Sequence, residues 1–391
     1  MKDEKAPTVY LDSHATTPVD QDVLNSMLPF FTQKFANGNH RAGWETAAAL
    51  EAARHQVAAY LGARPSEITF TSGATESINL ALLGLADNNP DNRQHIITQR
   101  TEHSAVLHCV EALVQKGFKV TMLEVDTVGR VDLNQLNDVI GEDTLVVAIM
   151  LANNEIGTVQ PVQQIGEICR KWGAKFFCDL TQGLGWHPVD VDLMQIDLAA
   201  LSAHKVYGPR GIGALFSRRK GDRVSLNPIC FGGGQERGLR PGTANIPGAV
   251  GFGKAIEIMT DTADNYFKSV QEMRDRLQDH LFSAIEGIQL NGCPISRHPG
   301  NLNISIPGVS GEDLIGALPH LIFSTGSACT SGSAKLSHVL SALGTDPKLL
   351  NKAFRFGIGK YNTMEEIDYV GNIIVEKVQA LQKRRQKMVP T

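Results

Sequence analysis

Short apolar runs alternate along this chain with segments of helical apolar spacing, and the alternation limits its fold more than any other feature. The run TLVVAIML (144–151) is almost continuously apolar, as expected of a strand that is buried on both faces of a sheet. The segments 104–117 before it and 162–173 after it both have the spacing of amphipathic helices. We therefore predict a mostly parallel α/β sheet. Because such sheets bind ligands at the carboxyl ends of their strands, the residues that follow each strand are candidates for a site.

The pattern changes after about Pro247. A long helical region, roughly 247–286, precedes three predicted strands, NLNISIPG, LIFSTG and FRFGIG, and a final helix that is expected to begin at Met364. This order of elements indicates a smaller α+β unit. We predict a large domain over 15–260 and a small domain made of 1–14 and 261–391.

Composition excludes some classes of partner. The chain has 391 residues and a formal net charge of -4, so electrostatics gives no general case for nucleic-acid binding. No stretch approaches the ~20 apolar residues of a membrane span. The N-terminal residues also lack the apolar region of a secretory signal. We expect a cytoplasmic protein with no membrane or nucleic-acid partner.

The six cysteines do not suggest a metal site. None forms a C-x-x-C pair, so no zinc or other metal centre is predicted, and free thiols in a reducing compartment are expected. Five of them should pack as small buried hydrophobic residues. The exception is Cys329, in the glycine-rich polar segment STGSACTSGSAKLSH (324–338), which suits a loop that carries a thiol between two places.

Polar residues stand at the ends of several predicted strands. The segment TSGATES (71–77) opens a helix after a glycine turn, which places backbone N–H groups and the Thr75 hydroxyl where a phosphate could bind. A threonine there is also a common helix cap. His103 precedes another helix, where it could be a cap or a catalytic group. Asp179 ends the apolar run FFCD, and a carboxylate in that position needs a cationic or hydrogen-bonding partner.

Two further strand ends complete the candidate site. LANNEIGTVQP (151–161) places two asparagines and a glutamate after an apolar strand, which favours a polar ligand over a bare turn. Ser202, His204 and Lys205 end another strand, and a lysine is rare there unless its charge or its amine is used. A phosphate cradle, an aspartate, a histidine and a lysine together suit pyridoxal phosphate, in which lysine bonds to the aldehyde carbon and aspartate pairs with the ring nitrogen.

The motifs TSGATES, TEHSAV, NNEIGTVQP, CDLTQ and SAHKVYGPRGIGAL resemble those of the cysteine desulfurases, which are fold-type I pyridoxal-phosphate enzymes of the class-V aminotransferase family. LDSHATTPVD, FGGGQERGLRPGT, STGSACTSGS and RFGIGK extend the resemblance over nearly the whole chain, in the order and at the spacing of that family. The resemblance implies a large domain with a mostly parallel sheet and a smaller α+β domain. It also implies conversion of L-cysteine to L-alanine, with the sulfur transferred to a protein thiol as a persulfide.

The resemblance assigns roles to individual residues. Lys205 is implied to bond covalently to the cofactor and then to act as the base at the substrate Cα, and Cys329 is implied to be the nucleophile that takes the sulfur. His103 would stack on the cofactor ring and Asp179 would pair with its nitrogen. Arg355 would bind the substrate carboxylate. The other residues implied to bind cofactor or substrate are Ala74, Thr75, Asn154, Gln182, Ser202, His204 and Thr243.

The resemblance also implies partners. Thr243, in RPGT, matches a residue that reaches the cofactor phosphate of the neighbouring subunit, so a homodimer with two composite sites is expected. The persulfide would pass to a sulfur-acceptor protein, for iron–sulfur cluster assembly or another sulfur-containing product.

Three alternatives remain open from the sequence. A selenocysteine lyase or another fold-type I pyridoxal-phosphate enzyme would need no cysteine on such a loop to transaminate. A nicotinamide dehydrogenase could be built on GPRGIG (208–213) and FGGGQERG, but these glycines lack the context of a strand before them and a helix after. A non-catalytic scaffold is disfavoured because Lys205, Asp179 and His103 are intact.

Overall fold

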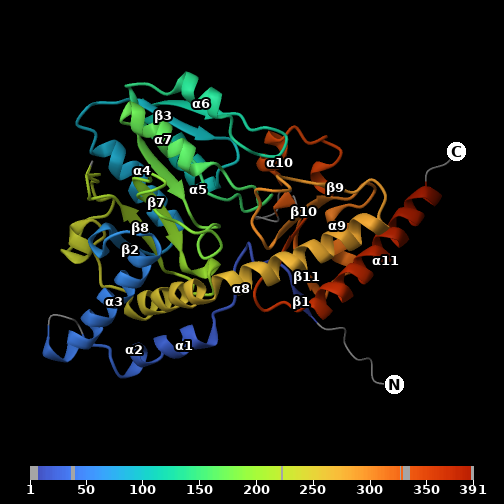
Figure 1. Cartoon of the computed structure of the whole chain (residues 1–391), viewed down its shortest axis with the longest axis horizontal. Coiled ribbons are helices and arrows are strands. Elements are labelled where there is room, and N and C mark those ends of the chain that lie inside the picture. The colour runs from blue at the N-terminus through green and yellow to red at the C-terminus, as the bar shows by residue number, and fades with distance from the viewer. Residues whose placement is uncertain (1–7, 37–39, 222, 326, 329–334, 389–391) are drawn as a thin grey trace.

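A seven-stranded sheet forms the centre of the fold in the computed structural model, which describes residues 8–36, 40–221, 223–325, 327–328 and 335–388. Its strand order is β2-β8-β7-β6-β5-β3-β4 (Figure 1). The run from β7 to β4 is parallel, as predicted, whereas β8 is antiparallel to both of its neighbours. The strands are β2 (Ile68–Thr71), β3 (His95–Gln99), β4 (Lys119–Leu123), β5 (Thr144–Ala148), β6 (Lys175–Asp179), β7 (Leu198–Ser202) and β8 (Gly213–Ser217).

The sheet is buried on both faces, which explains why its central strands are continuously apolar. In β7, Leu198 and Ala200 pack on one face, whereas Ala199 and Leu201 pack on the other. The first face is covered by α4 and α5, and the second by α3, α6, α7 and the first half of α8. The helices are α1 (Gln21–Met27), α2 (Pro29–Thr32), α3 (Trp44–Tyr60), α4 (Ala74–Asp87), α5 (Ser104–Gln115), α6 (Leu133–Val139), α7 (Val162–Trp172), α8 (Ile246–Ala284), α9 (Gly311–Ala317), α10 (His338–Ala342) and α11 (Met364–Met388).

A second, antiparallel sheet follows in the C-terminal part, in the order β12-β15-β10-β9. Two short strands, β1 and β11, pair in parallel, which joins the N-terminal segment to the C-terminal part of the chain (Figure 1). The remaining strands are β1 (Val9–Tyr10), β9 (Gln289–Leu290), β10 (Asn301–Ser305), β11 (Leu321–Ile322), β12 (Ser324–Thr325), β13 (Ser327–Ala328), β14 (Lys335–Leu336) and β15 (Ala353–Gly357).

The prediction of one strand over LIFSTG is wrong. The structure divides this segment into β11, which pairs with β1, and β12, which pairs with β15. The buried Phe323 lies between the two strands and contacts the aromatic rings of Phe354 and Phe356. The chain therefore changes its pairing partner around this anchored side chain.

Helix α8 connects the two parts of the molecule. Figure 1 shows it running from the large sheet toward the second one, with α11 beside its later part. The domain boundary predicted at residue 260 falls inside this continuous helix, and the division into domains stays a prediction. Over the described residues, no helix combines the length and the apolar character that crossing a membrane requires.

The cysteine prediction holds for four thiols and is wrong for one. Cys109, Cys169, Cys178 and Cys293 are buried, and burial raises the pKa of the Cys109 thiol to about 12. Cys230 is exposed instead, because it lies in an irregular segment between β8 and α8 rather than in a packed layer. Cys329 lies outside the described residues.

Candidate active site

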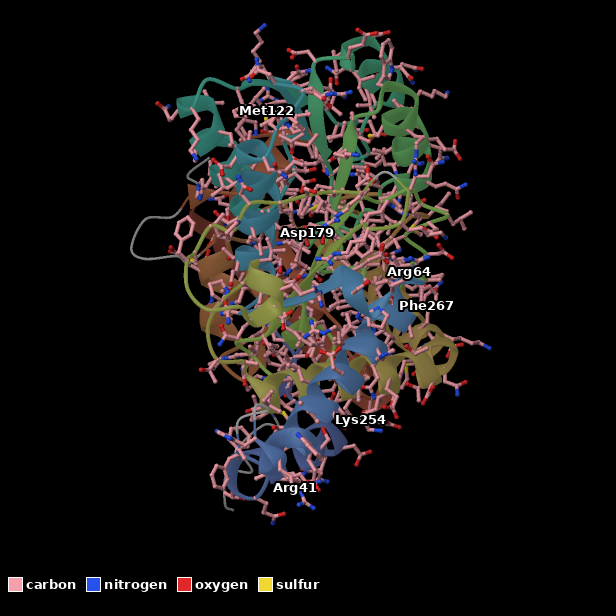
Figure 2. The ribbon with its side chains drawn as sticks, turned by 90° about the vertical axis from the view of Figure 1, so that its left-hand side faces the viewer. Arg41, Arg64, Met122, Asp179, Lys254 and Phe267 are labelled. Carbon is pink, nitrogen blue, oxygen red and sulfur yellow. The ribbon has the colours of Figure 1, made fainter. Side chains whose placement is uncertain are left out.

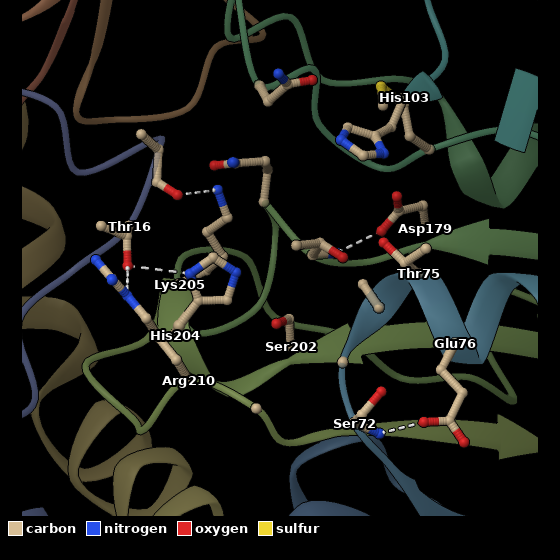
Figure 3. Close-up of a pocket in the computed structure, with 18 of the residues that line it drawn as sticks. Thr16, Ser72, Thr75, Glu76, His103, Asp179, Ser202, His204, Lys205 and Arg210 are labelled. Atoms are coloured by element: carbon tan, nitrogen blue, oxygen red, sulfur yellow. Dashed lines mark hydrogen bonds between the residues drawn. The ribbon is translucent and has the colours of Figure 1, made fainter. Parts of the chain in front are cut away.

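A cavity of about 610 Å³ opens where the strands of the large sheet end. Figure 2 shows Asp179 near the middle of the molecule, and Figure 3 shows how neighbouring strand ends contribute to the cavity. The sequence places these residues far apart, and the parallel topology brings their strand ends together. The predicted site residues that line the cavity are Ala74, Thr75, His103, Asn154, Asp179, Gln182, Ser202, His204 and Lys205.

The N-terminus of α4 forms one wall of the cavity. Gly73 precedes the helix with a φ of 154°, and the first N–H groups of a helix have no partner within it. These N–H groups, together with the helix dipole, attract an anion. Thr75 and Ser202 add hydroxyls, and Arg210 adds a positive charge to the cavity from the side of Thr16 and His204 (Figure 3).

The carboxylate of Glu76 also lies in this wall, and its negative charge is compensated by neighbouring groups. It accepts hydrogen bonds from the Ser72 N–H at 2.6 Å and from Arg240 Nε at 2.8 Å. Although burial opposes the shift, these hydrogen bonds lower the pKa of Glu76. Because Arg240 compensates its charge, the wall remains suited to a phosphate.

Lys205 ends the short 3-10 helix η3 (Ala203–Lys205), directly after β7. Its Nζ donates to the His14 carbonyl and to the Ala15 carbonyl, the latter at 2.9 Å. Burial lowers the pKa of Lys205 to about 8, and the charge of Arg355 acts in the same direction. The amine is therefore much easier to deprotonate than an exposed lysine.

Asp179 and His103 both line the cavity. Asp179 is 5% exposed, and its Oδ1 accepts from the Thr181 N–H at 2.9 Å. His103 Nδ1 accepts from the Ala105 N–H at 3.2 Å, so this histidine caps α5 as well as lining the cavity. Burial lowers the pKa of His103. The two interpretations of His103 from the sequence, cap and site residue, are thus compatible.

The two asparagines after β5 have different places. Asn153 is buried and makes the turn, since its Oδ1 accepts from the N–H groups of Glu155 and Ile156. Asn154 lines the cavity. Glu155 is tied to Ser337 by a hydrogen bond from the serine hydroxyl. Turn chemistry therefore explains one asparagine and leaves the other for a ligand.

Arg355 lies in β15 and lines a second cavity, also of about 610 Å³, which shares His103 and Asn154 with the first. Its Nη2 donates to Asp12 Oδ1 at 2.7 Å and to Ser324 Oγ at 2.9 Å, and its Nη1 donates to the Asn154 carbonyl at 2.9 Å. Its Nε is buried and has no hydrogen-bond partner within the described ranges. The guanidinium is therefore fixed in the second cavity, next to Asn154, which lines both cavities.

One predicted site residue that the structure describes is absent from both cavities. Thr243 is exposed and does not line the cavity of its own chain. Cys329 lies outside the residues that the structure describes. The sequence analysis in turn missed Thr16 and Arg210, which meet in the cavity wall, with Arg210 Nε 3.3 Å from Thr16 Oγ1. Thr16 lies in the motif LDSHATTPVD, but nothing local in that motif indicates that it folds against a segment near residue 210.

Comparison with known proteins places the chain in a family. The Aminotransferase class-V family matches residues 9–370. The cysteine desulfurase IscS of Anaeromyxobacter sp. (strain Fw109-5) is 47% identical over 378 residues, which cover 96% of this chain and 93% of the relative. The chain belongs to the class-V aminotransferase family, among the cysteine desulfurases. This membership confirms the predicted fold class, cofactor and enzyme class.

Solved structures agree with this assignment to the class-V aminotransferases. A NifS-like protein superposes with a TM-score of 0.89 at 38% identity, over 95% of this chain and 99% of the other. The structure of SspA in complex with cysteine gives a TM-score of 0.81 at 34% identity, over 91% of this chain and all of the other. The segment GPRGIG, by contrast, leads into β8 and not into a helix, so it lacks the context of a dinucleotide loop.

The cavity fits the pyridoxal phosphate of a class-V aminotransferase. The anion-binding wall at α4, the Asp179 carboxylate and the Lys205 amine all line the same 610 Å³ space. Thr181 Oγ1 also belongs to the lining and, in the part of the chain described, is buried without a hydrogen-bond partner. A buried hydroxyl of this kind gains a partner when a polar ligand binds.

Proposed function

We propose that this enzyme converts L-cysteine to L-alanine and carries the released sulfur as a persulfide on Cys329. The observation that supports the proposal best is the joining of two cavities at His103 and Asn154. The first cavity is lined by the residues expected to bind the cofactor, and the second contains Arg355, which is expected to bind an amino-acid carboxylate. A substrate at the junction would be in reach of both.

The residues around the first cavity would hold the cofactor by its two charged ends. The N-terminus of α4, with Thr75, Ser202 and His204, would bind the phosphate, and Asp179 would pair with the ring nitrogen. When bound, pyridoxal phosphate supplies an electron-accepting ring that stabilises negative charge at the substrate Cα. His103 would lie against that ring.

Lys205 is proposed to remove the proton from the substrate Cα. Two properties of its site support this role: burial lowers the pKa of the amine to about 8, and the carbonyls of His14 and Ala15 accept from its Nζ. The first property makes the neutral amine available as a base near neutral pH. The second stabilises the ammonium once it has taken the proton.

Arg355 and Asn154 are proposed to hold the substrate. The Arg355 guanidinium is oriented by Asp12 and Ser324, and a planar guanidinium binds a carboxylate through two parallel hydrogen bonds. Arg355 donates to the carbonyl of Asn154, which lines both cavities. An amino acid bound by Arg355 would therefore be aligned with its Cα toward Lys205.

Cys329 is proposed to accept the sulfur as its thiolate. The Cys329 sulfur forms a bond to the substrate sulfur while the bond from that sulfur to the substrate Cβ breaks. The electron pair of the broken bond stays with Cβ, which takes up a proton, and Lys205 returns a proton to Cα. The products are L-alanine and a Cys329 persulfide, which balances the atoms and electrons of L-cysteine and the thiol without another oxidant.

A homodimer is part of the proposal. Thr243 is exposed and does not line its own cavity, which supports a place for it at the phosphate of a neighbouring subunit. Large apolar side chains gather on the exposed surface of α1, α2 and α3 and the segments beside them. These are Leu28, Phe31, Phe35 and Trp44, which are 52%, 59%, 76% and 64% exposed. Sedimentation should give a mass near twice the 42.4 kDa chain, and a monomeric mass would contradict the proposal.

The persulfide is proposed to pass to a sulfur-acceptor protein in the cytoplasm, for iron–sulfur clusters or another sulfur-containing product.

The proposal is tested by replacing Cys329 with serine and assaying alanine release from L-cysteine. The variant should keep the visible cofactor band near ~420 nm but lose alanine release and persulfide formation. The matched control is Cys230→Ser, which changes an exposed cysteine outside the cavity and should keep the activity. Near wild-type turnover by Cys329→Ser would exclude Cys329 as the sulfur acceptor, and a Lys205→Ala protein that kept the band would exclude the covalent role of Lys205.

A further inference from the structure

His14 lies directly behind the cavity wall, and it accepts hydrogen bonds from two side chains that line the cavity. It is 3% exposed, and it follows the strand β1 on the segment whose next residues, Ala15 and Thr16, line the cavity. Its carbonyl accepts from Lys205 Nζ and, at 2.9 Å, from Gln182 Nε2. One backbone oxygen thus serves both side chains.

The His14 ring makes a second contact with the same glutamine, and this contact fixes its tautomer. His14 Nδ1 lies 3.1 Å from Gln182 Oε1. Since Gln182 Nε2 already donates to the His14 carbonyl, Oε1 is the acceptor of the amide, and Nδ1 carries the proton. Burial, together with the charges of Arg355 and Lys205, lowers the pKa of His14 to about 3, although hydrogen bonds with Gln182 and the Gly300 backbone act in the opposite direction. The ring is therefore neutral near neutral pH.

This pair of hydrogen bonds determines which way the Gln182 amide points. A reversed amide would set its oxygen against the oxygen of the His14 carbonyl, and this repulsion would remain whichever ring nitrogen carried the proton. With the amide fixed, one hydrogen of Nε2 is used by the carbonyl. The other remains for the cavity that Gln182 lines.

We infer that His14 is a positioning residue that presents the second Nε2 hydrogen of Gln182 to an oxygen on the ring of the bound cofactor. The inference rests on the proposed place of Gln182 beside that ring. A donor at this point stabilises negative charge on the ring oxygen. It therefore affects the proton that the oxygen shares with the cofactor-bound nitrogen of Lys205.

The surroundings of His14 keep its ring in this orientation. The His298 ring meets it edge-on with centroids 4.6 Å apart, and Trp186 and His187 pack around His298. The charged groups that act on the ring are those of Arg355 and Lys205. Burial lowers the pKa of both His298 and His187, so this cluster adds no charge near neutral pH.

The experiment is a spectroscopic pH titration of the cofactor-loaded protein, with variants at residues 14 and 182. His14→Ala leaves the Gln182 donor in place but no longer fixed by the ring, so it should raise the pH at which the ~420 nm band titrates by about one unit. His14→Asn can place an N–H near the position of Nδ1 and should restore most of the wild-type value. The control is His187→Phe, which keeps an aromatic ring in the cluster but has no contact with Gln182, and it should titrate as wild type.

Gln182→Ala separates this inference from the proposed function. If it shifts the band and the His14→Ala shift is largely lost in the double variant, the two residues act together as inferred. A shift in Gln182→Ala with none in His14→Ala would overturn the inference and keep the glutamine at the ring. If neither variant shifts the band, both the inference about His14 and the proposed place of Gln182 at the cofactor ring are excluded. Should His14→Ala fold poorly, a wild-type titration by His14→Phe, which keeps the ring volume, would be equally decisive against the inference.

Discussion

Arg355 Nη2 and Asp12 Oδ1 lie 2.7 Å apart, so an arginine from the last strand of the chain is oriented by an aspartate near its beginning. Both side chains are largely buried, at 12% and 15% exposure. A largely buried ion pair of this kind holds its geometry better than one at the surface. The proposed substrate arginine is thus set in place before the substrate arrives.

Arg355→Lys should raise the KM for L-cysteine by roughly 10- to 100-fold, the cost of one or two charge-assisted hydrogen bonds. A lysine keeps the charge but has only three N–H donors, too few to serve Asp12, Ser324, the Asn154 carbonyl and a carboxylate at once. The effect on kcat should be smaller, because the groups at the cofactor are unchanged. Alanine release measured over a range of L-cysteine concentrations separates the two constants, and an unchanged KM would exclude Arg355 from substrate binding.

Loading of the cofactor-free protein with pyridoxal phosphate should depend on the charge of Lys205. Only the neutral amine attacks the aldehyde, and burial lowers the pKa of Lys205 to about 8. The rate of loading should therefore rise as the pH increases through about 8. Arg355→Met removes a positive charge that helps to lower this pKa, so its loading curve should move to higher pH. Growth of the visible band after mixing gives the rate, and an unmoved curve would contradict this coupling.

Glu102 should make the stability of the protein depend on pH. Its Oε1 accepts from the Met150 N–H and from Gln99 Nε2, and burial raises the pKa of the carboxyl from 4.5 to about 8. The unfolded chain releases this proton at lower pH than the folded protein. The contribution of Glu102 to stability is therefore complete below pH 4.5 and is lost as the pH rises toward 8.

Glu102→Gln keeps both accepted hydrogen bonds and removes this titration. Relative to wild type, its free energy of unfolding should increase between pH 5 and pH 8 by about 3 kcal/mol. Denaturant unfolding at the two pH values measures the difference. The exposed Glu111→Gln in α5 is the control and should show no such trend. Parallel curves for wild type and Glu102→Gln would mean that Glu102 titrates normally.

Gly213→Ala should weaken cofactor binding by roughly tenfold, which corresponds to about 1.4 kcal/mol. A Cβ at Gly213 would lie 2.4 Å from the Leu201 carbonyl oxygen and 2.7 Å from the Gly73 Cα. Both neighbours are backbone, so the turn before α4 would have to move, and with it the proposed phosphate site. Titration of the cofactor-free protein gives the affinity. Gly141→Ala, where a Cβ meets nothing within 4 Å, should bind as wild type, and equal affinities for the two variants would exclude this packing argument.

The sequence predicts those parts of the site that depend on local pattern. Asp179 is identifiable because it ends a continuously apolar run, and Lys205 because it follows one closely, and a buried strand with a charged residue at its end is visible without any tertiary information. The same argument gave the parallel core of the sheet. It could not give the direction of β8, because an antiparallel strand that is buried on both faces has the same apolar pattern.

The parts that depend on long-range pairing could not be predicted. Asp12 is hydrogen-bonded to Arg355, 343 positions later in the chain, and His14 to Gln182, 168 positions later. No periodicity in one segment of either pair indicates the other segment. The division of LIFSTG into two strands likewise depends on β1, which supplies the partner for β11. The exposure of Cys230 reflects the tertiary packing around its loop and not its residue type.

The pairing of β1 with β11 has a consequence for synthesis of the protein on the ribosome. Translation makes Val9 and Tyr10 first, but their partners in this pairing, Leu321 and Ile322, are made more than three hundred residues later. Until then the strand that leads to His14 and Ala15 has no sheet to join, and this segment relies on contacts such as those of His14 with Gln182 and of Thr17 with His204. The large sheet can form on the nascent chain, whereas the amine at its centre reaches its final setting only near the end of translation.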